Sequence, residues 1–157
     1  MKNRINILIL SCGTRNKLIQ YFKKELKNDG LVVATDCSEL APALYDADKF
    51  FITPRITDET YIDTILKICK ENDIKAVLSL IDPELSMLAK NKDEFLNIGT
   101  IPIVPDYELV ETCFDKYLFL KKIRELGFNY IRSYINKDAF YSDLHNGIVD
   151  FPVFIKP

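Results

Sequence analysis

Two lysines stand where a positive charge gains little from local structure. Lys116 opens a predicted helix, where a cation opposes the helix dipole. Lys156 ends an apolar strand-like run and is followed by Pro157. Each lysine taken alone is more often a solvated surface residue. One lysine on each side of a small αβ unit also suits a polyphosphate, so both are candidate phosphate ligands.

A second group of candidate residues follows three predicted strands in the first part of the chain. Gly13 and Arg15 join the first strand to the first helix, and Asp36 closes the second strand. Asp82 and Glu84 follow a later strand. Because ligands of open α/β sheets bind at the carboxyl ends of the strands, we expect all five residues at one rim. The helix N-terminus there favours anions, and Arg15 suits a phosphate or a carboxylate.

Each rim residue also has an ordinary structural interpretation. Gly13 is a turn glycine, and Arg15 is an exposed helix arginine. Asp36 is a turn former, Asp82 a helix N-cap, and Glu84 a favourable charge at a helix dipole. Asp36 also stands where a ribose-binding acid lies in nicotinamide-dependent enzymes. Only Gly13 of the required GxGxxG pattern is present, so this dinucleotide signal is weak.

The elements that position the rim alternate short apolar runs with helix-period segments, a pattern typical of parallel α/β sheets. The predicted strands are Ile5–Leu10, Leu31–Thr35, Phe50–Ile52, Ala76–Ile81 and Thr100–Val104. The predicted helices are Arg15–Asn28, a helix capped by Thr57-Asp58 that ends near Asn72, and a short helix with Asp82 as N-cap and Pro83 at its first position. We therefore expect a Rossmann-like parallel sheet flanked by helices over residues 1–110.

Residues 111–157 show a different pattern. The predicted elements are a helix from Asp115 to Leu126, a strand at Tyr130–Tyr134, a helix at Lys137–His145 and a strand-like run at Phe151–Pro157. Domains rarely end inside an apolar strand, because its partners must come from elsewhere. We therefore expect an incomplete α+β segment that begins a second, truncated domain. An exposed strand edge also predicts a homodimer.

Composition and charge exclude several classes of protein. The 157 residues include 48% hydrophobic and 28% charged side chains, with 10 Phe and 8 Tyr, which argues against disorder. The net charge of -2 predicts no nucleic-acid partner. No apolar run approaches the ~20 residues of a membrane span. The apolar run Ile5–Leu10 is shorter than the ~7–15 residues of a secretory signal, so we expect a cytoplasmic protein.

The cysteines and the single histidine show no metal-binding pattern. Cys12, Cys37, Cys69 and Cys113 are widely spaced, with no CxxC pair, and His145 is the only histidine. Zinc sites need such ligands clustered at short spacing, so we predict no metal site. Buried reduced thiols are the favoured interpretation, although the sequence leaves a Cys–His nucleophilic pair open.

Several segments resemble the carbamoyl-phosphate-synthase-like proteins of the ATP-grasp superfamily. They are DCSELAPALYDADKF (Asp36–Phe50), YIDTILKICKENDI (Tyr61–Ile74) and LIDPEL (Leu80–Leu85). The stretch from Asp115-Lys116 to the final FPVFIKP resembles the opening of an ATP-grasp domain. The likeness covers nearly the whole chain. It implies that residues 1–110 are a pre-ATP-grasp domain and that residues 111–157 begin the nucleotide-binding domain.

The resemblance implies the N-terminal part of an ATP-dependent ligase that activates a small carboxylate as an acyl phosphate, with ATP and Mg²⁺ as cofactors of the full-length protein. Lys116 and Lys156 match the family's ATP-binding lysines. The residues of the rim would face the carboxylate substrate. Relatives commonly show two basic residues after the first glycine, where this chain has Thr14 and Arg15.

The glycine-rich lid and the Mg²⁺-binding carboxylates of the family are absent from the 157 residues. We therefore expect no catalytic residue in this part of the ligase, no activity of its own and no tightly bound cofactor. Two other functions stay open from the sequence. One is a non-catalytic binding or regulatory module, and the other is an NAD-dependent oxidoreductase domain.

Overall fold

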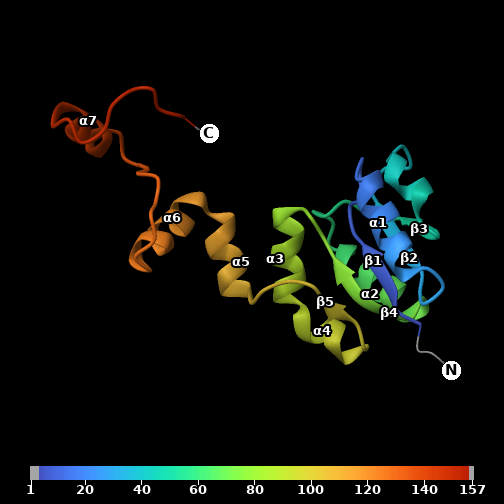
Figure 1. Cartoon of the computed structure of the whole chain (residues 1–157). Helices are drawn as coiled ribbons and strands as arrows, with labels where there is room; N and C mark the ends of the chain where they lie inside the picture. Colours follow the sequence, from blue (N-terminus) through green and yellow to red (C-terminus); the bar gives the residue numbers. More distant parts are fainter. Residues whose placement is uncertain (1–3, 156–157) are drawn as a thin grey trace. The chain divides into compact units, whose positions relative to one another are not determined.

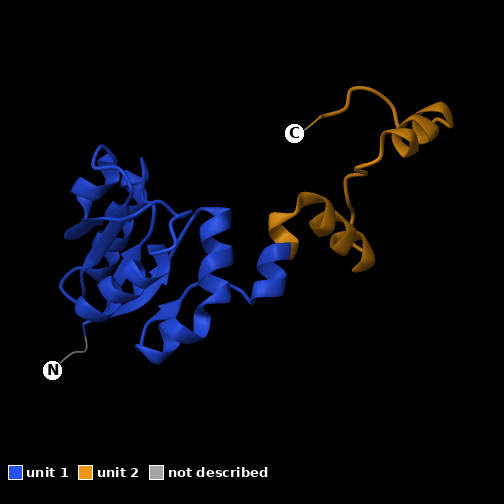
Figure 2. Cartoon of the chain, turned by 180° about the vertical axis from the view of Figure 1, so that it is seen from behind, with its two compact units in different colours: residues 1–111 blue, residues 112–157 orange. Residues whose placement is uncertain are grey.

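The structure is a computed structural model that describes residues 4–155. Figure 1 shows the elements in chain order. They are β1 (Asn6–Ile9), α1 (Asn16–Leu26), β2 (Val32–Asp36), the 3-10 helix η1 (Pro42–Asp46), β3 (Lys49–Ile52), α2 (Tyr61–Glu71), β4 (Ile74–Leu78), α3 (Asp82–Lys90), α4 (Lys92–Asn97), β5 (Ile101–Pro102), α5 (Tyr107–Phe114), α6 (Lys116–Glu125) and α7 (Lys137–His145). The chain forms two compact units, Met1–Glu111 and Thr112–Pro157, coloured separately in Figure 2.

The first unit is built on a five-stranded sheet with the strand order β3-β2-β1-β4-β5. All four strand pairs are parallel, and β1 is buried along its whole length between β2 and β4. The chain moves from β1 outwards to β3 and then returns to place β4 on the other side of β1. This reversal creates a topological switch point between β1 and β4, where open parallel sheets bind ligands.

Alternate strand residues supply a core on each face of the sheet. One core joins α1 and η1 to the sheet through Ile7, Ile9, Ile19, Val32, Ala34 and Leu44. The other joins α2, α3 and α4 to the opposite face through Leu8, Leu10, Val33, Ile65, Val77, Leu88 and Phe95. Because both faces are covered, the central strands are almost entirely apolar, as parallel strands usually are.

A glycine fixes the approach of the chain to the amino end of β2. Gly30 is buried, and a Cβ built on it would lie 1.9 Å from the carbonyl oxygen of Ile5. The Ile5 N–H donates to the carbonyl of Asp29 at 2.8 Å, which holds the two backbones together. Only a residue without a side chain fits this close approach.

The sequence-based prediction of a parallel α/β sheet is confirmed, with several local corrections. The predicted strand Thr100–Val104 pairs only over Ile101–Pro102. Helix α2 begins three residues later than its predicted cap suggests, because Asp58 instead accepts hydrogen bonds from Thr60 in a turn. The elements η1, α4 and α5 were not predicted, since each is too short or too irregular in its apolar spacing.

In the second unit the predicted helices are confirmed and the predicted strands are wrong. Asp115 caps α6 by accepting the N–H groups of Tyr117 and Leu118. Tyr130–Tyr134 is irregular, and Phe151–Ile155 contains no strand either. Apolar alternation makes a strand only where another strand pairs with it, and none does within the described part of this unit. The segment before α7 is fixed by side chains instead, because Arg132 and the hydroxyl of Tyr134 both donate to Asp143.

None of the helices within residues 4–155 is long and apolar enough to span a membrane.

Candidate functional site

The loop between β1 and α1 lies at the carboxyl end of the central strand and carries an unusual backbone. Ser11 has φ 41° and Gly13 has φ 51°. The left-handed conformation suits glycine, but at Ser11 it costs on the order of 1–3 kcal/mol. The surrounding structure must therefore hold Ser11 in place.

Asp36 holds one side of this loop. Its Oδ2 accepts the backbone N–H of Gly13 at 2.8 Å, and its Oδ1 accepts the N–H of Ser38 at 3.0 Å. The Asp36 side chain is only 9% exposed. Both carboxylate oxygens thus accept backbone N–H groups at the ends of β1 and β2. Because these oxygens are engaged and buried, Asp36 is poorly placed to bind the ribose of a nucleotide.

Glu84 holds the other side of the loop from beneath. Its side chain is 0% exposed. Oε1 accepts the hydroxyl of Ser11 at 2.7 Å and also the hydroxyl of Tyr61, and Oε2 accepts the hydroxyl of Ser79. Among the described residues no basic side chain forms an ion pair with Glu84. Three hydroxyl donors from three elements therefore replace the water that burial removes.

The electrostatics of this cluster keep its other groups neutral. Burial, and then the negative charge of Glu84, raise the pKa of the Tyr61 phenol, which therefore stays protonated and donates. Burial, and then the charge of Asp36, raise the pKa of the Cys12 thiol to about 11. A thiol with such a pKa is a poor nucleophile, which argues against a catalytic Cys12.

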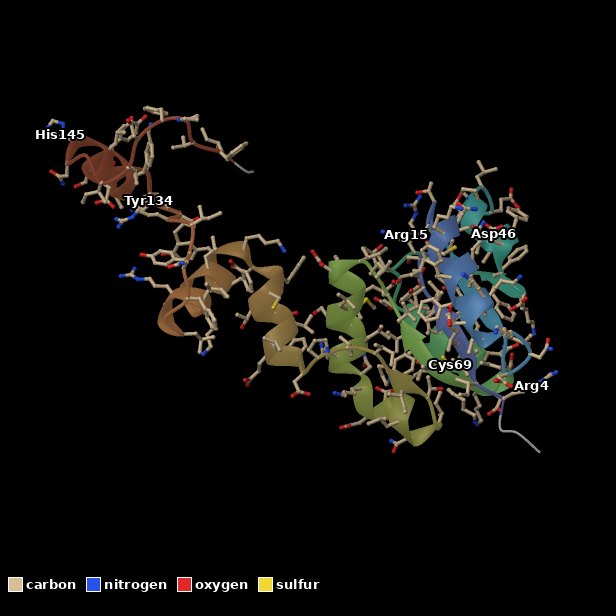
Figure 3. All side chains as sticks on the ribbon, in the orientation of Figure 1. Arg4, Arg15, Asp46, Cys69, Tyr134 and His145 are labelled. Carbon is tan, nitrogen blue, oxygen red and sulfur yellow. The ribbon has the colours of Figure 1, made fainter. Side chains whose placement is uncertain are left out.

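Arg15 lies beside the loop at the start of α1, at the end of the sheet away from Arg4 (Figure 3). Its Nη1 donates to the carbonyl of Ser11 at 3.1 Å, so the guanidinium folds back over the loop. Its other N–H groups have no acceptor among residues 4–155. A guanidinium with free donors beside a helix N-terminus suits a bidentate carboxylate or phosphate.

The two acidic residues that follow β4 differ in their exposure to solvent. Asp82 is exposed in the first turn of α3, and Glu84 is buried beneath the rim rather than on it. The predicted N-cap role of Asp82 is wrong, because Ile81 occupies the N-cap position with an extended backbone. The carbonyl of Ile81 accepts the N–H of Glu84 and of Leu85 at 3.0 Å.

The structure thus brings Gly13, Arg15, Asp36 and Glu84 together around one loop, and it adds three hydroxyl residues that sequence reasoning missed. Ser11, Tyr61 and Ser79 give no sign of their role by type or spacing. The only available signal was the position of Ser11 and Ser79 directly after predicted strands. Among the described residues, no group of three His, Cys, Asp or Glu side chains could hold a metal ion.

The candidate ATP-binding lysines belong to the second unit. Lys116 is exposed at the first position of α6, and its Nζ donates to the carbonyl of Cys113 at 3.2 Å. Lys156 lies outside the described residues.

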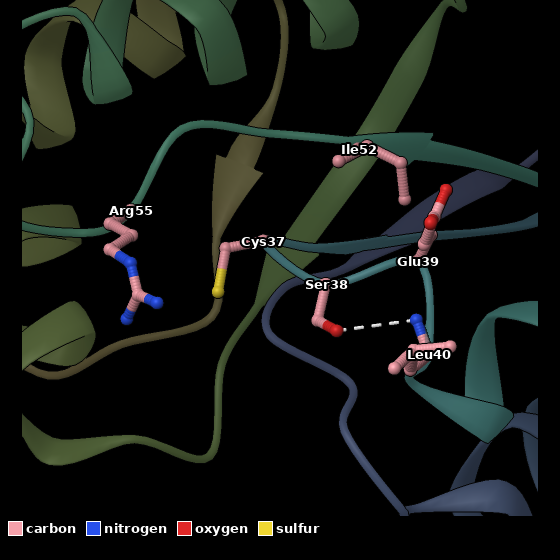
Figure 4. Close-up of a pocket in the computed structure, with 6 residues that line it drawn as sticks. All are labelled: Cys37, Ser38, Glu39, Leu40, Ile52 and Arg55. Atoms are coloured by element: carbon pink, nitrogen blue, oxygen red, sulfur yellow. Dashed lines mark hydrogen bonds between the residues drawn. The ribbon is translucent and has the colours of Figure 1, made fainter.

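A shallow depression lies next to the end of β2. It has a volume of about 410 Å³ and is lined by Cys37, Ser38, Glu39, Leu40, Ile52 and Arg55. The Ser38 hydroxyl oxygen accepts the backbone N–H of Leu40 at 3.2 Å, a hydrogen bond that is drawn as a dashed line in Figure 4. All six lining residues are exposed, so the depression offers a ligand little burial.

Comparison with known protein families identifies the family to which this chain belongs. The family described as PylC-like, N-terminal domain matches residues 7–104. The chain belongs to this family. The matched range contains the whole β1–α1 loop together with Asp36, Tyr61 and Glu84, so the site lies inside the PylC-like domain. No curated protein matches the sequence.

Several solved structures share the fold of this chain, and the similarity covers more of the chain than the PylC-like domain does. The N5-carboxyaminoimidazole synthetase of Staphylococcus aureus, solved with ADP, has a TM-score of 0.64 at 16% identity, covering 94% of this chain and 36% of its own. The N5-carboxyaminoimidazole ribonucleotide synthetase of Thermotoga maritima has a TM-score of 0.64 at 18% identity, with 90% and 36% covered. The biotin carboxylase subunit of a pyruvate carboxylase has a TM-score of 0.59 at 20% identity, with 97% and 34% covered.

At these identities the likeness establishes the fold, and the chain spans about a third of the length of these structures. The sequence-based prediction of a pre-ATP-grasp domain is confirmed by the PylC-like N-terminal domain, whereas the likeness to carbamoyl-phosphate-synthase-like proteins in particular stays a prediction.

Proposed function

We propose that this chain is the N-terminal part of an ATP-dependent ligase that activates a small carboxylate as an acyl phosphate. The observation that carries the proposal is the PylC-like domain at residues 7–104 within a fold shared, over 94% of the chain, with a synthetase solved with ADP. An L-amino acid ligase from Bacillus licheniformis has the same fold at a TM-score of 0.58 and 18% identity, over 82% of this chain and 32% of its own.

In this proposal the β1–α1 loop receives the carboxylate substrate. The free donors of Arg15 pair with the two carboxylate oxygens, and the amino end of α1 adds its favourable dipole. Glu84 and Asp36 take no direct part, because their oxygens are occupied by the protein itself.

The nucleotide part of the proposal rests on the second unit. Lys116, at the exposed start of α6, and Lys156 would contact the phosphates of ATP and offset the charge that develops during phosphoryl transfer. We place the ligands of Mg²⁺ outside residues 4–155. We accordingly propose that residues 1–157 alone do not turn over ATP, and that catalysis belongs to the longer polypeptide.

A direct test uses the full-length polypeptide that contains this chain. It is incubated with ATP, Mg²⁺ and a panel of amino acids and other small carboxylates, and release of ADP is measured. The carboxylate that stimulates release is then labelled with ¹⁸O. An acyl phosphate intermediate passes one labelled oxygen to inorganic phosphate when the nucleophile displaces it. If no carboxylate stimulates ADP release, or if the phosphate stays unlabelled, the proposal fails.

The role of Arg15 is tested with a matched pair of variants. Loss of a charged hydrogen-bonding partner costs roughly 1.5–3 kcal/mol, so Arg15→Ala should raise the KM of the carboxylate about 10- to 100-fold. The KM of ATP should not change. Lys17→Ala, which removes an exposed cation from the same end of α1, is the control and should leave both constants unchanged.

A further inference from the structure

We propose that Glu84 is a positioning residue that fixes the β1–α1 loop and thereby sets where Arg15 meets the substrate carboxylate, a role that rests on the proposed function. Glu84 touches neither the substrate nor the nucleotide in this scheme. It acts through Ser11, which is the link between a buried acid and a guanidinium at the rim.

The route consists of two consecutive hydrogen bonds. Glu84 accepts the Ser11 hydroxyl at 2.7 Å, and the Ser11 carbonyl accepts Nη1 of Arg15 at 3.1 Å. One residue thus binds Glu84 with its side chain and Arg15 with its backbone. Any rotation of the Ser11 backbone moves the carbonyl that orients the guanidinium.

Ser11 needs this restraint because its backbone is strained. Its φ of 41° lies in the left-handed region, which a serine leaves readily when nothing holds it. The bond to Glu84 opposes that relaxation. The bond between Asp36 and Gly13 restrains the other end of the loop, so loss of Glu84 should free Ser11 and loosen the Gly13 bond without unfolding the whole connection.

Another partner of Glu84, Ser79, allows this role to be separated from simple stabilisation. Ser79 donates to the opposite carboxylate oxygen, Oε2, and its own oxygen accepts the N–H of Ile81 at 3.1 Å. Ser79 therefore belongs to the β4–α3 connection, and its hydrogen bonds to Glu84 and Ile81 do not include the β1–α1 loop. Ser11→Ala and Ser79→Ala each remove one hydroxyl donor from the same buried acid, and only Ser11→Ala releases the loop.

A buried carboxylate without a cationic partner is costly to keep. Removing a carboxylate from water costs several kcal/mol even after the protein relaxes, and three neutral hydroxyls return only part of that cost. An apolar side chain of similar volume would be buried at this position without this penalty. The acid is therefore best explained by the conformation it imposes on Ser11.

The test compares four ¹⁵N-labelled 157-residue chains by NMR: wild type, Ser11→Ala, Glu84→Met, which removes the acceptor at similar side-chain length, and Ser79→Ala. The first readout is the hydrogen-exchange rate of the Gly13 amide together with the Nε–H signal of Arg15, which report the loop and the guanidinium directly. The second is the dissociation constant of acetate, used as a minimal carboxylate probe. Global stability is measured in parallel by urea denaturation.

We expect Ser11→Ala and Glu84→Met to accelerate Gly13 exchange, shift the Arg15 signal and weaken acetate binding about 10-fold. Ser79→Ala should lose comparable global stability and leave all three local readouts near wild type. The proposal is overturned if Ser79→Ala changes the loop as much as Ser11→Ala, or if Ser11→Ala leaves Gly13 exchange unchanged.

A fifth variant distinguishes failure of this inference from failure of the proposed function. Arg15→Ala should abolish measurable acetate binding in the otherwise intact loop. If acetate binds Arg15→Ala as it binds wild type, the rim is not the carboxylate site, and the proposed function fails together with the positioning role. If Arg15→Ala loses binding while Ser11→Ala retains it, only the positioning role of Glu84 is refuted.

Discussion

Replacement of Gly30 by alanine should be among the most destabilising single-methyl changes in the first unit. A Cβ at this position would lie 1.9 Å from the carbonyl oxygen of Ile5 and 2.6 Å from its carbonyl carbon. Both atoms are backbone, so no side chain can rotate away. Ordinary contact begins at 3.4 Å, and the two backbones must therefore separate by about 1.5 Å.

The cost of that separation follows from the contacts it stretches. The hydrogen bond from Ile5 N–H to Asp29 at 2.8 Å and the one from Ile7 N–H to Leu31 at 2.9 Å both join the separating segments. Two such bonds contribute about 1 kcal/mol each, and overpacking costs a further 1–3 kcal/mol. We expect Gly30→Ala to lower the free energy of unfolding by about 3–5 kcal/mol, a large part of the roughly 5–15 kcal/mol typical of a domain.

The assay is urea denaturation followed by far-ultraviolet circular dichroism, with Gly99→Ala as the matched control. Gly99 has φ 79°, but no atom lies within 4 Å of a Cβ built there. Its replacement should therefore cost only the backbone strain of about 1–2 kcal/mol. If Gly30→Ala proves no less stable than Gly99→Ala, the close approach of Gly30 to Ile5 does not govern this part of the sheet.

Two further predictions concern the cap of α6 and the buried thiols. Asp115→Ala should destabilise α6 by about 0.5–2 kcal/mol, whereas Asp115→Asn retains an acceptor for the same N–H groups and should stay near wild type, as measured by hydrogen exchange of the helix. Burial raises the pKa of Cys12 to about 11 and that of Cys69 to about 12, so the stability of these neutral thiols is complete below the unfolded value of 9.0 and is lost as the pH rises through 11–12. Urea denaturation at pH 8 and pH 10.5 should show this loss, and iodoacetamide at pH 8 should modify only the exposed Cys37 and Cys113 in the folded chain; early labelling of Cys12 would contradict the assignment.

The sheet could be predicted from sequence because each central strand is a short apolar run followed by a turn. Ile5–Leu10 and Leu31–Thr35 have almost no polar residues, as strands covered on both faces require. Strand pairing is less accessible, because it depends on residues far away in the chain. The strand predicted at Tyr130–Tyr134 shows this limit, since its aromatic and β-branched residues favour a strand but no neighbouring strand pairs with them.

The site could be located from sequence but its internal connections could not. Parallel topology brings the ends of β1, β2 and β4 to one edge, so Arg15 and Asp36 could be placed there without coordinates. The burial of Glu84 could not be foreseen, because Asp82, the acid two residues earlier in the same helix turn, is exposed. The hydroxyl of Ser11 lies 73 residues away from its acceptor, and serines give no periodic signal.

The distribution of the restraints on the β1–α1 loop has a consequence for protein engineering. The loop takes its shape from Asp36 on β2 and Glu84 on α3 as much as from its own residues. Grafting the segment Ser11–Arg15 onto another parallel sheet would transfer the guanidinium but not the conformation that presents it. A successful transplant must carry the two distant acids as well, so the smallest transferable unit of this site is the set of β1, β2, β4 and α3 with the connections between them.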